Sequence, residues 1–115
     1  MRLIRSFDFE AAHKLEWHLG KCQRLHGHNY HFEVTIEGPL NANGVVMDFD
    51  DLKEIVKKTV IAKYDHQFLN DFLENPTAEL LAQDIFEMLK EQNLPIYSIR
   101  LWETPQASVE ILAGS

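Results

Sequence analysis

The sequence predicts an α+β protein in which an antiparallel sheet carries helices on one of its faces. Two long segments near the start alternate apolar and polar residues, as half-buried strands do, and two shorter ones lie near the end. Between them, two segments carry apolar residues at helical spacing. Strands at both ends with helices between them give the order β-β-α-α-β-β, which favours a layered α+β fold.

The strands are predicted from the alternation itself. Apolar side chains occupy odd positions from Leu3 to His13 and even positions from His26 to Ile36. The last two strands are centred on 97–103 and 109–111, with a turn at Pro105-Gln106 between them. Because alternate side chains share a face, each strand has one apolar face for a common core.

The two helices are predicted from their caps and apolar stripes. Asp48 or Asp50 can cap the first helix, whose stripe is Leu52, Ile55, Val56 and Val60. The second opens at Asn75-Pro76-Thr77, with Asn75 or Thr77 as cap and proline tolerated in the first turn. Its stripe is Leu81, Ile85, Met88 and Leu89.

Length and composition indicate a single small domain spanning residues 1–115 that binds neither nucleic acid nor membranes. Hydrophobic residues make up 45% of the chain, enough for one core, and the net charge of −7 disfavours a general nucleic-acid or anionic-membrane surface. No segment approaches the roughly 20 apolar residues that span a bilayer. A single cysteine excludes an internal disulfide. We therefore expect a cytoplasmic protein.

Three histidines break the apolar faces of the first two strands at one end. His13 ends the apolar face of the first strand, and His26 and His28 begin that of the second. Residues two apart on a strand point the same way, and consecutive strands usually pair, so the three imidazoles can converge. His31 falls on the polar face, and neither it nor His18 is expected to be a ligand.

Three converging imidazoles favour a metal ion, because polar groups buried without partners are costly. Neutral imidazole is the commonest zinc ligand, and three histidines with an open fourth position are typical of catalytic zinc sites. Separately, each histidine is more simply interpreted as a strand-end or hydrogen-bonded residue. The shared face of His13, His26 and His28 predicts a Zn²⁺ site.

Three further groups each allow two interpretations. Cys22 is either a small buried side chain or a thiol beside a dication, able to act as base or nucleophile. Asp65-His66 is either a helix end that favours histidine or a carboxylate-oriented imidazole that moves protons. Glu103, on an apolar face, must be paired, either as a fourth metal ligand or as an anchor for a guanidine-like substrate edge.

Five segments together resemble the 6-pyruvoyl-tetrahydropterin synthase family over essentially the whole chain. They are FEAAH at 9–13, CQRLHGH at 22–28, DH at 65–66, NPTAE at 75–79 and WET at 102–104. Each segment alone is unspecific, whereas their ordered combination is highly specific.

The resemblance implies the tunnelling fold (T-fold), a four-stranded antiparallel sheet with two helices on one face. Family members form trimers whose sheets close a barrel, often as a dimer of trimers, with active sites at subunit interfaces. The resemblance also implies zinc on the three histidines and Cys22 as catalytic base working with Asp65 and His66. Glu103 would anchor a pterin triphosphate substrate, helped by the Thr77 segment.

The spacing between Cys22 and His26 resembles the branch that forms 6-carboxy-tetrahydropterin. That branch, in queuosine or archaeosine synthesis, converts 7,8-dihydroneopterin triphosphate to 6-carboxy-5,6,7,8-tetrahydropterin, acetaldehyde and triphosphate. We therefore predict a zinc-dependent lyase of this kind. The alternatives are 6-pyruvoyl-tetrahydropterin synthase, a non-catalytic pterin- or purine-binding protein, and a zinc-stabilised assembly protein.

Overall fold

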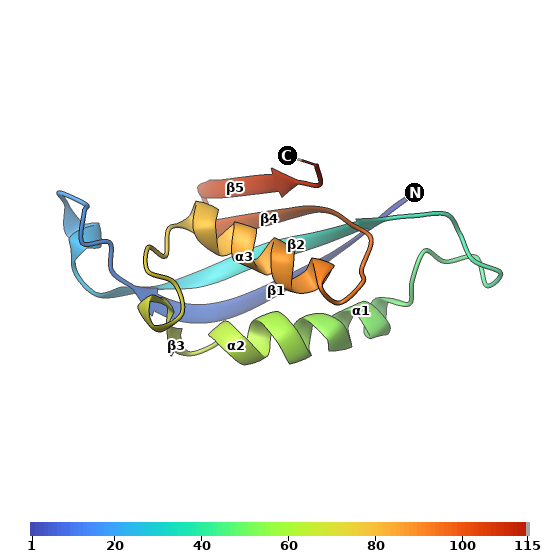
Figure 1. The fold of residues 1–115 in the computed structure, drawn as a ribbon, viewed down its shortest axis with the longest axis horizontal. Helices are drawn as coiled ribbons and strands as arrows, with labels where there is room; N and C mark the ends of the chain where they lie inside the picture. Colours follow the sequence, from blue (N-terminus) through green and yellow to red (C-terminus); the bar gives the residue numbers. More distant parts are fainter. Residues whose placement is uncertain (115) are drawn as a thin grey trace.

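The computed structural model describes residues 1–114 and contains one mixed sheet with helices on one face (Figure 1). The strands lie in the order β3-β1-β2-β4-β5. Their bounds are β1 Arg2–His13, β2 His26–Glu37, β3 Gln67–Phe68, β4 Ile96–Thr104 and β5 Ala107–Leu112. All neighbours are antiparallel except β3 and β1. The predicted α+β layering is confirmed.

β1 and β2 form a long hairpin whose register brings the predicted histidines to one end of the molecule. Opposed pairs run from Arg2 and Glu37 at one end to His13 and His26 at the other. The odd side chains of β1 and the even side chains of β2 share the core face, as the alternation predicts. The connection between the strands contains the short 3-10 helix η1 (Lys21–Gln23).

The sheet has five strands, so the prediction of a four-stranded antiparallel sheet is wrong in one respect. The additional strand, β3, pairs in parallel with β1 opposite Ala11 and Ala12. His66, with a φ of 59°, turns the chain there. A strand of two residues is too short to show an alternation of apolar and polar residues in the sequence. Its pairing depends on this turn and not on an apolar face.

The first helical region runs from α1 (Phe49–Val56) through a π-helical segment (Lys57–Ile61) into α2 (Ala62–Tyr64). Asp48 caps it by accepting a hydrogen bond from the Asp50 amide at 2.7 Å. It extends beyond the predicted stripe, and Tyr64 is buried with the core. The 3-10 helix η3 (Leu69–Asp71) follows β3.

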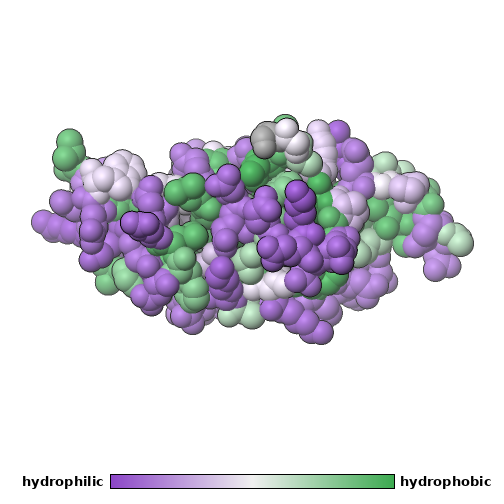
Figure 2. Space-filling view, in the orientation of Figure 1, coloured by the Kyte–Doolittle hydropathy of each residue, from purple (hydrophilic) through white to green (hydrophobic). Residues whose placement is uncertain are grey.

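The second helix, α3 (Ala78–Lys90), packs over β4 and β5. Thr77 is its cap and accepts a hydrogen bond from the Leu80 amide at 3.1 Å. The core lies between the helices and the sheet, and its residues from α3 are Leu81, Ala82, Ile85, Phe86 and Leu89. Hydrophilic residues predominate on the outer side of α3 (Figure 2). Within residues 1–114, no helix is both long and apolar enough to cross a membrane.

Candidate metal centre

The three predicted histidines meet at the open end of the β1–β2 hairpin. His13 is the last residue of β1 and lies opposite His26 on β2, and His28, two residues further along β2, lies opposite Ala11. The Nε2 atoms of His13 and His26 are 3.0 Å apart, and one ligand atom from each of the three side chains lies within 4.8 Å of the others. The predicted convergence is confirmed, because the three side chains are placed to hold a metal ion.

Backbone carbonyls fix the orientation of two of these rings. The Nδ1 of His13 lies 2.8 Å from the carbonyl oxygen of Pro76, and the Nδ1 of His26 lies 2.8 Å from that of Arg24. A ring that donates its Nδ1–H to a carbonyl presents its Nε2 lone pair to a metal. The sequence could not reveal these partners, because every residue has a carbonyl group.

The third imidazole supplies an independent sign that the site fits a cation. The Nε2 of His28 is buried and has no hydrogen-bond partner among the described residues. Burial also lowers the pKa of His28, which favours the neutral, metal-binding form. A buried nitrogen without a hydrogen bond is costly, and a metal ion at the centre of the triad would satisfy it.

Glu103 of β4 contacts two rings of the triad. Its Oε1 lies 3.2 Å from His13 Nε2 and 3.5 Å from His28 Nε2. The β4–β5 register shifts between Trp102 and Thr104, at the position of Glu103. The hydrogen bond from His13 lowers the pKa of Glu103 against the effect of burial. Burial opposes protonation of His13, but Glu103 and the Pro76 carbonyl outweigh it and raise its pKa.

Tyr30 lies beside the histidine triad and is a site residue that was not predicted from the sequence. It is fully buried, and its hydroxyl lies 3.3 Å from His13 Nδ1. Burial raises its pKa, so the phenol stays protonated. Tyr30 has the same face parity as His26 and His28, and that parity is the signal that could have identified it.

Asp65 and His66 form a dyad at the outer edge of β1. Asp65 Oδ2 lies 3.0 Å from His66 Nδ1, and Asp65 Oδ1 accepts a hydrogen bond from the Glu10 amide at 3.0 Å. That amide is the main reason why the pKa of Asp65 is lowered. The His66 side chain is 74% exposed. The predicted carboxylate–imidazole pair therefore forms, and no interaction between the described residues joins it to the histidine triad.

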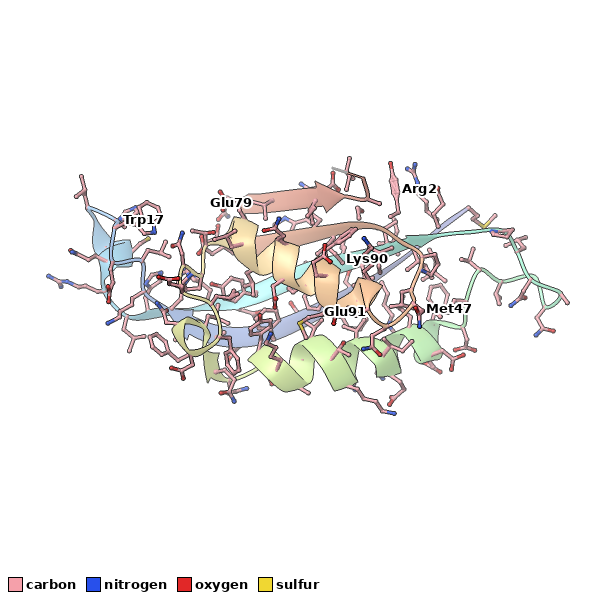
Figure 3. All side chains as sticks on the ribbon, in the orientation of Figure 1. Arg2, Trp17, Met47, Glu79, Lys90 and Glu91 are labelled. Atoms are coloured by element: carbon pink, nitrogen blue, oxygen red, sulfur yellow. The ribbon has the colours of Figure 1, made fainter. Side chains whose placement is uncertain are left out.

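Cys22 and Thr77 lie in segments that border the metal centre. Cys22 is half-buried in η1, and its carbonyl accepts a hydrogen bond from the Leu15 amide at 2.7 Å. Thr77 follows Pro76, and its hydroxyl is used as the cap of α3. Trp17 ties the two segments together by donating to Asn75 Oδ1 at 2.8 Å. Figure 3 shows Trp17 in the loop at this end of the molecule.

The residues predicted not to be ligands lie apart from the triad. His31 pairs with Asp8 on the uncovered face of the sheet, with 2.9 Å between Nδ1 and Oδ1. His18 accepts a hydrogen bond from the Gly20 amide at 2.8 Å. Face parity thus separated His31 from the clustered histidines, and His18 lies in the loop between β1 and β2.

Fold and site together define an α+β protein with a preassembled three-histidine centre and a separate carboxylate–imidazole dyad. The chain belongs to the 6-pyruvoyl tetrahydropterin synthase family, whose sequence profile matches residues 2–113. The resemblance inferred from the sequence motifs is therefore confirmed.

Three curated relatives show how the family divides. The chain is 44% identical to a putative 6-carboxy-5,6,7,8-tetrahydropterin synthase of Archaeoglobus fulgidus, over 92% of this chain and 90% of the relative. It is 39% identical to a 6-carboxy-5,6,7,8-tetrahydropterin synthase of Haemophilus influenzae, over 95% of this chain and 96% of the relative. A dihydroneopterin monophosphate aldolase of Pyrococcus furiosus is 37% identical, over 96% of both chains.

A solved structure confirms the fold. The 6-pyruvoyl tetrahydropterin synthase of Caenorhabditis elegans superposes with a TM-score of 0.89 at 27% identity, covering 99% of this chain and 96% of that chain. The T-fold prediction is borne out, except that the sheet has a fifth, short strand, β3.

Proposed function

We propose that this protein is a lyase that converts 7,8-dihydroneopterin triphosphate to 6-carboxy-5,6,7,8-tetrahydropterin, releasing acetaldehyde and triphosphate, in 7-deazaguanine biosynthesis. The observation that carries the proposal is the histidine triad with Glu103 beside it, in a chain 39% identical to a synthase of that name. The spacing from Cys22 to His26 supports the carboxy-forming branch.

The resident metal in this proposal is Zn²⁺, held by His13, His26 and His28. Three neutral imidazoles with an open position suit zinc. When bound, the ion would supply Lewis acidity to hydroxyl groups of the substrate side chain. The Pro76 and Arg24 carbonyls keep two of the rings oriented for it.

The other site residues receive roles from their chemistry. Cys22 is the proposed base that removes a proton from the substrate side chain, and His66, oriented by Asp65, is the proposed second proton-transfer group. Glu103 is the proposed anchor for the aminopyrimidine edge of the pterin, which offers paired N–H donors to a carboxylate. The Thr77 segment would border the bound ring.

We further propose that the active site is shared between copies of the chain. The triad lies at the end of the core face of the sheet, whereas His66 lies at the β1 edge with its side chain exposed. β5 and residues 2–10 of β1 form sheet edges with no further strand paired to them among the described residues. Pairing of these edges, in a trimer or a dimer of trimers, would bring the dyad of one copy toward the triad of the next.

The product assay tests the proposed reaction. Zinc-loaded protein is incubated with 7,8-dihydroneopterin triphosphate, and the pterin, acetaldehyde and triphosphate are quantified separately. We expect all three in equal amounts, and Cys22→Ala should lose at least about 100-fold in kcat while still binding the pterin. His31→Ala, which lies outside the triad, is the matched control.

Other products would contradict this proposal. A 6-pyruvoyl product would assign the chain to the pyruvoyl-forming reaction, and a different aldehyde would indicate an aldolase. Pterin binding by the wild type without turnover of any pterin phosphate would establish a non-catalytic binding protein. Loss of assembly on chelation, with no activity to lose, would favour a zinc-stabilised assembly protein.

A further inference from the structure

The backbone of Glu10 is hydrogen-bonded to both residues of the Asp65–His66 dyad. Its amide donates to Asp65 Oδ1 at 3.0 Å, and its carbonyl accepts from the His66 amide at 2.6 Å. The next residue, Ala11, pairs with Gln67 of β3. Both backbone groups of Glu10 are thus bonded to the dyad, beside the edge of β1 that Figure 1 shows next to β3. His66 holds its φ of 59° in this arrangement.

The side chain of Glu10 also faces the dyad. Its Oε2 lies 4.0 Å from His66 Nε2, while Asp65 Oδ2 lies 3.0 Å from His66 Nδ1. The imidazole of His66 therefore has the Asp65 carboxylate close to Nδ1 and the Glu10 carboxylate facing Nε2 at ion-pair distance. Because Asp65 accepts the Nδ1–H, the proton that His66 can take up or release is the one on Nε2, which is the nitrogen that faces Glu10.

This arrangement is open to a ligand or to another copy of the chain. Glu10, Gln67, His66 and His28 line one hollow of about 580 Å³ beside the β1–β3 edge. The side chains of Glu10 and His66 are 65% and 74% exposed. Asp8, two residues earlier on the same face of β1, instead pairs with His31, with 2.9 Å between Oδ1 and Nδ1.

We infer that Glu10 is a positioning residue for His66, and that its carboxylate orients the ring and stabilises the proton that Nε2 takes up during turnover. The inference rests on the proposed function, in which His66 transfers a proton. No covalent change at Glu10 is involved. The proton moves between the substrate and His66 Nε2, and Glu10 supplies the counter-charge while Asp65 holds Nδ1–H.

Glu10→Gln tests this inference because it keeps the size of the side chain and both backbone hydrogen bonds but removes the charge. We expect kcat to fall about tenfold, less than removal of a general base, with KM changed by less than about twofold. Glu10→Asp, which keeps the charge, should recover part of the loss. Asp8→Asn is the matched control and should leave both constants unchanged.

A second readout does not depend on activity. In ¹⁵N-histidine spectra of the substrate-free protein, Glu10→Gln should shift the His66 Nε2 signal, whereas Asp8→Asn should shift only signals of His31. An unshifted His66 signal would overturn the inference, as would an unchanged kcat in an active enzyme. If the wild type makes no pterin product, the proposed function fails, and the His66 spectrum alone then decides the inference about Glu10.

Discussion

At the scale of single residues, the hydrogen-bond partner of each imidazole determines how its ring is oriented in the candidate metal centre. Carbonyl oxygens hold the Nδ1 atoms of His13 and His26, and the buried Nε2 of His28 has no hydrogen-bond partner among residues 1–114. Face parity predicted which histidines meet, because a strand has a strict period of two. It could not predict the Pro76 carbonyl, which approaches from a segment 63 residues further along the chain.

Glu103 gives a pH-dependent stability to the metal-free protein. Its pKa is lowered below 4.5, so its contribution is present above that value and is lost as the pH falls through the folded-state pKa. The pKa of His13 is raised above 6.5, so its contribution is complete below that value and is lost as the pH rises through the folded-state pKa. The interaction therefore stabilises the fold most between these two values.

We accordingly expect Glu103→Gln to lower the free energy of unfolding of the chelated protein by about 1 kcal/mol near pH 5.5, from the typical hydrogen-bond contribution. The difference from wild type should shrink toward pH 3 and toward pH 9. Urea unfolding across this range measures it, with Glu110→Gln on β5 as an exposed control. A difference that does not vary with pH would show that the Glu103–His13 pair does not exist in solution.

At the scale of elements, the sequence predicts best those strands and helices in which a long periodic pattern ends at a clear boundary. The strands from Leu3 to His13 and from His26 to Ile36, and the stripe of α3, were predicted because each buries one continuous face. β3 was missed because two residues carry no periodicity. Its position depends instead on the bonds between Glu10 and the 65–66 turn, which are tertiary contacts.

At the start of α3, the residue that caps the helix, Thr77, follows the residue whose carbonyl orients His13, Pro76. Thr77→Ala tests whether the cap affects metal binding. Loss of the hydroxyl that caps the Leu80 amide should cost about 1 kcal/mol of stability. The adjacent Pro76 carbonyl, which orients His13, should become less well fixed. We therefore expect roughly tenfold weaker zinc binding, measured by competition with a chelator.

Asp48→Ala is the matched control for that measurement. It removes the corresponding cap of α1, with a similar expected cost of about 1 kcal/mol, but α1 supplies no group to the triad. Zinc affinity should stay at the wild-type value in this variant. Equal loss of affinity in both variants would mean that general destabilisation, and not the position of the Pro76 carbonyl, controls metal binding.

At the scale of the whole molecule, the candidate catalytic groups come from two parts of the fold, although His28 and His66 line one hollow beside the β1–β3 edge. The triad and Glu103 lie at the open end of the β1–β2 hairpin, whereas the Asp65–His66 dyad lies at the β1 edge. The sequence could identify both groups as candidate catalytic residues. It could not show that they lie on different parts of the fold, because the position of the dyad depends on how the 65–66 turn binds to β1. Two open sheet edges in the same chain suit the proposed assembly of copies.

A mixture of two inactive variants tests whether copies share a site. His26→Ala removes a triad member, and His66→Ala removes the imidazole of the dyad, so each variant alone should be inactive. If each site takes its triad from one copy and its dyad from the next, random co-assembly in equal amounts restores both groups in about a quarter of the sites. Co-expressed, differently tagged chains purified over both tags should then recover lyase activity of that order. A co-assembled mixture as inactive as its parents would mean that each chain supplies its own dyad, and a mixture of two His26→Ala pools is the control that fixes the background.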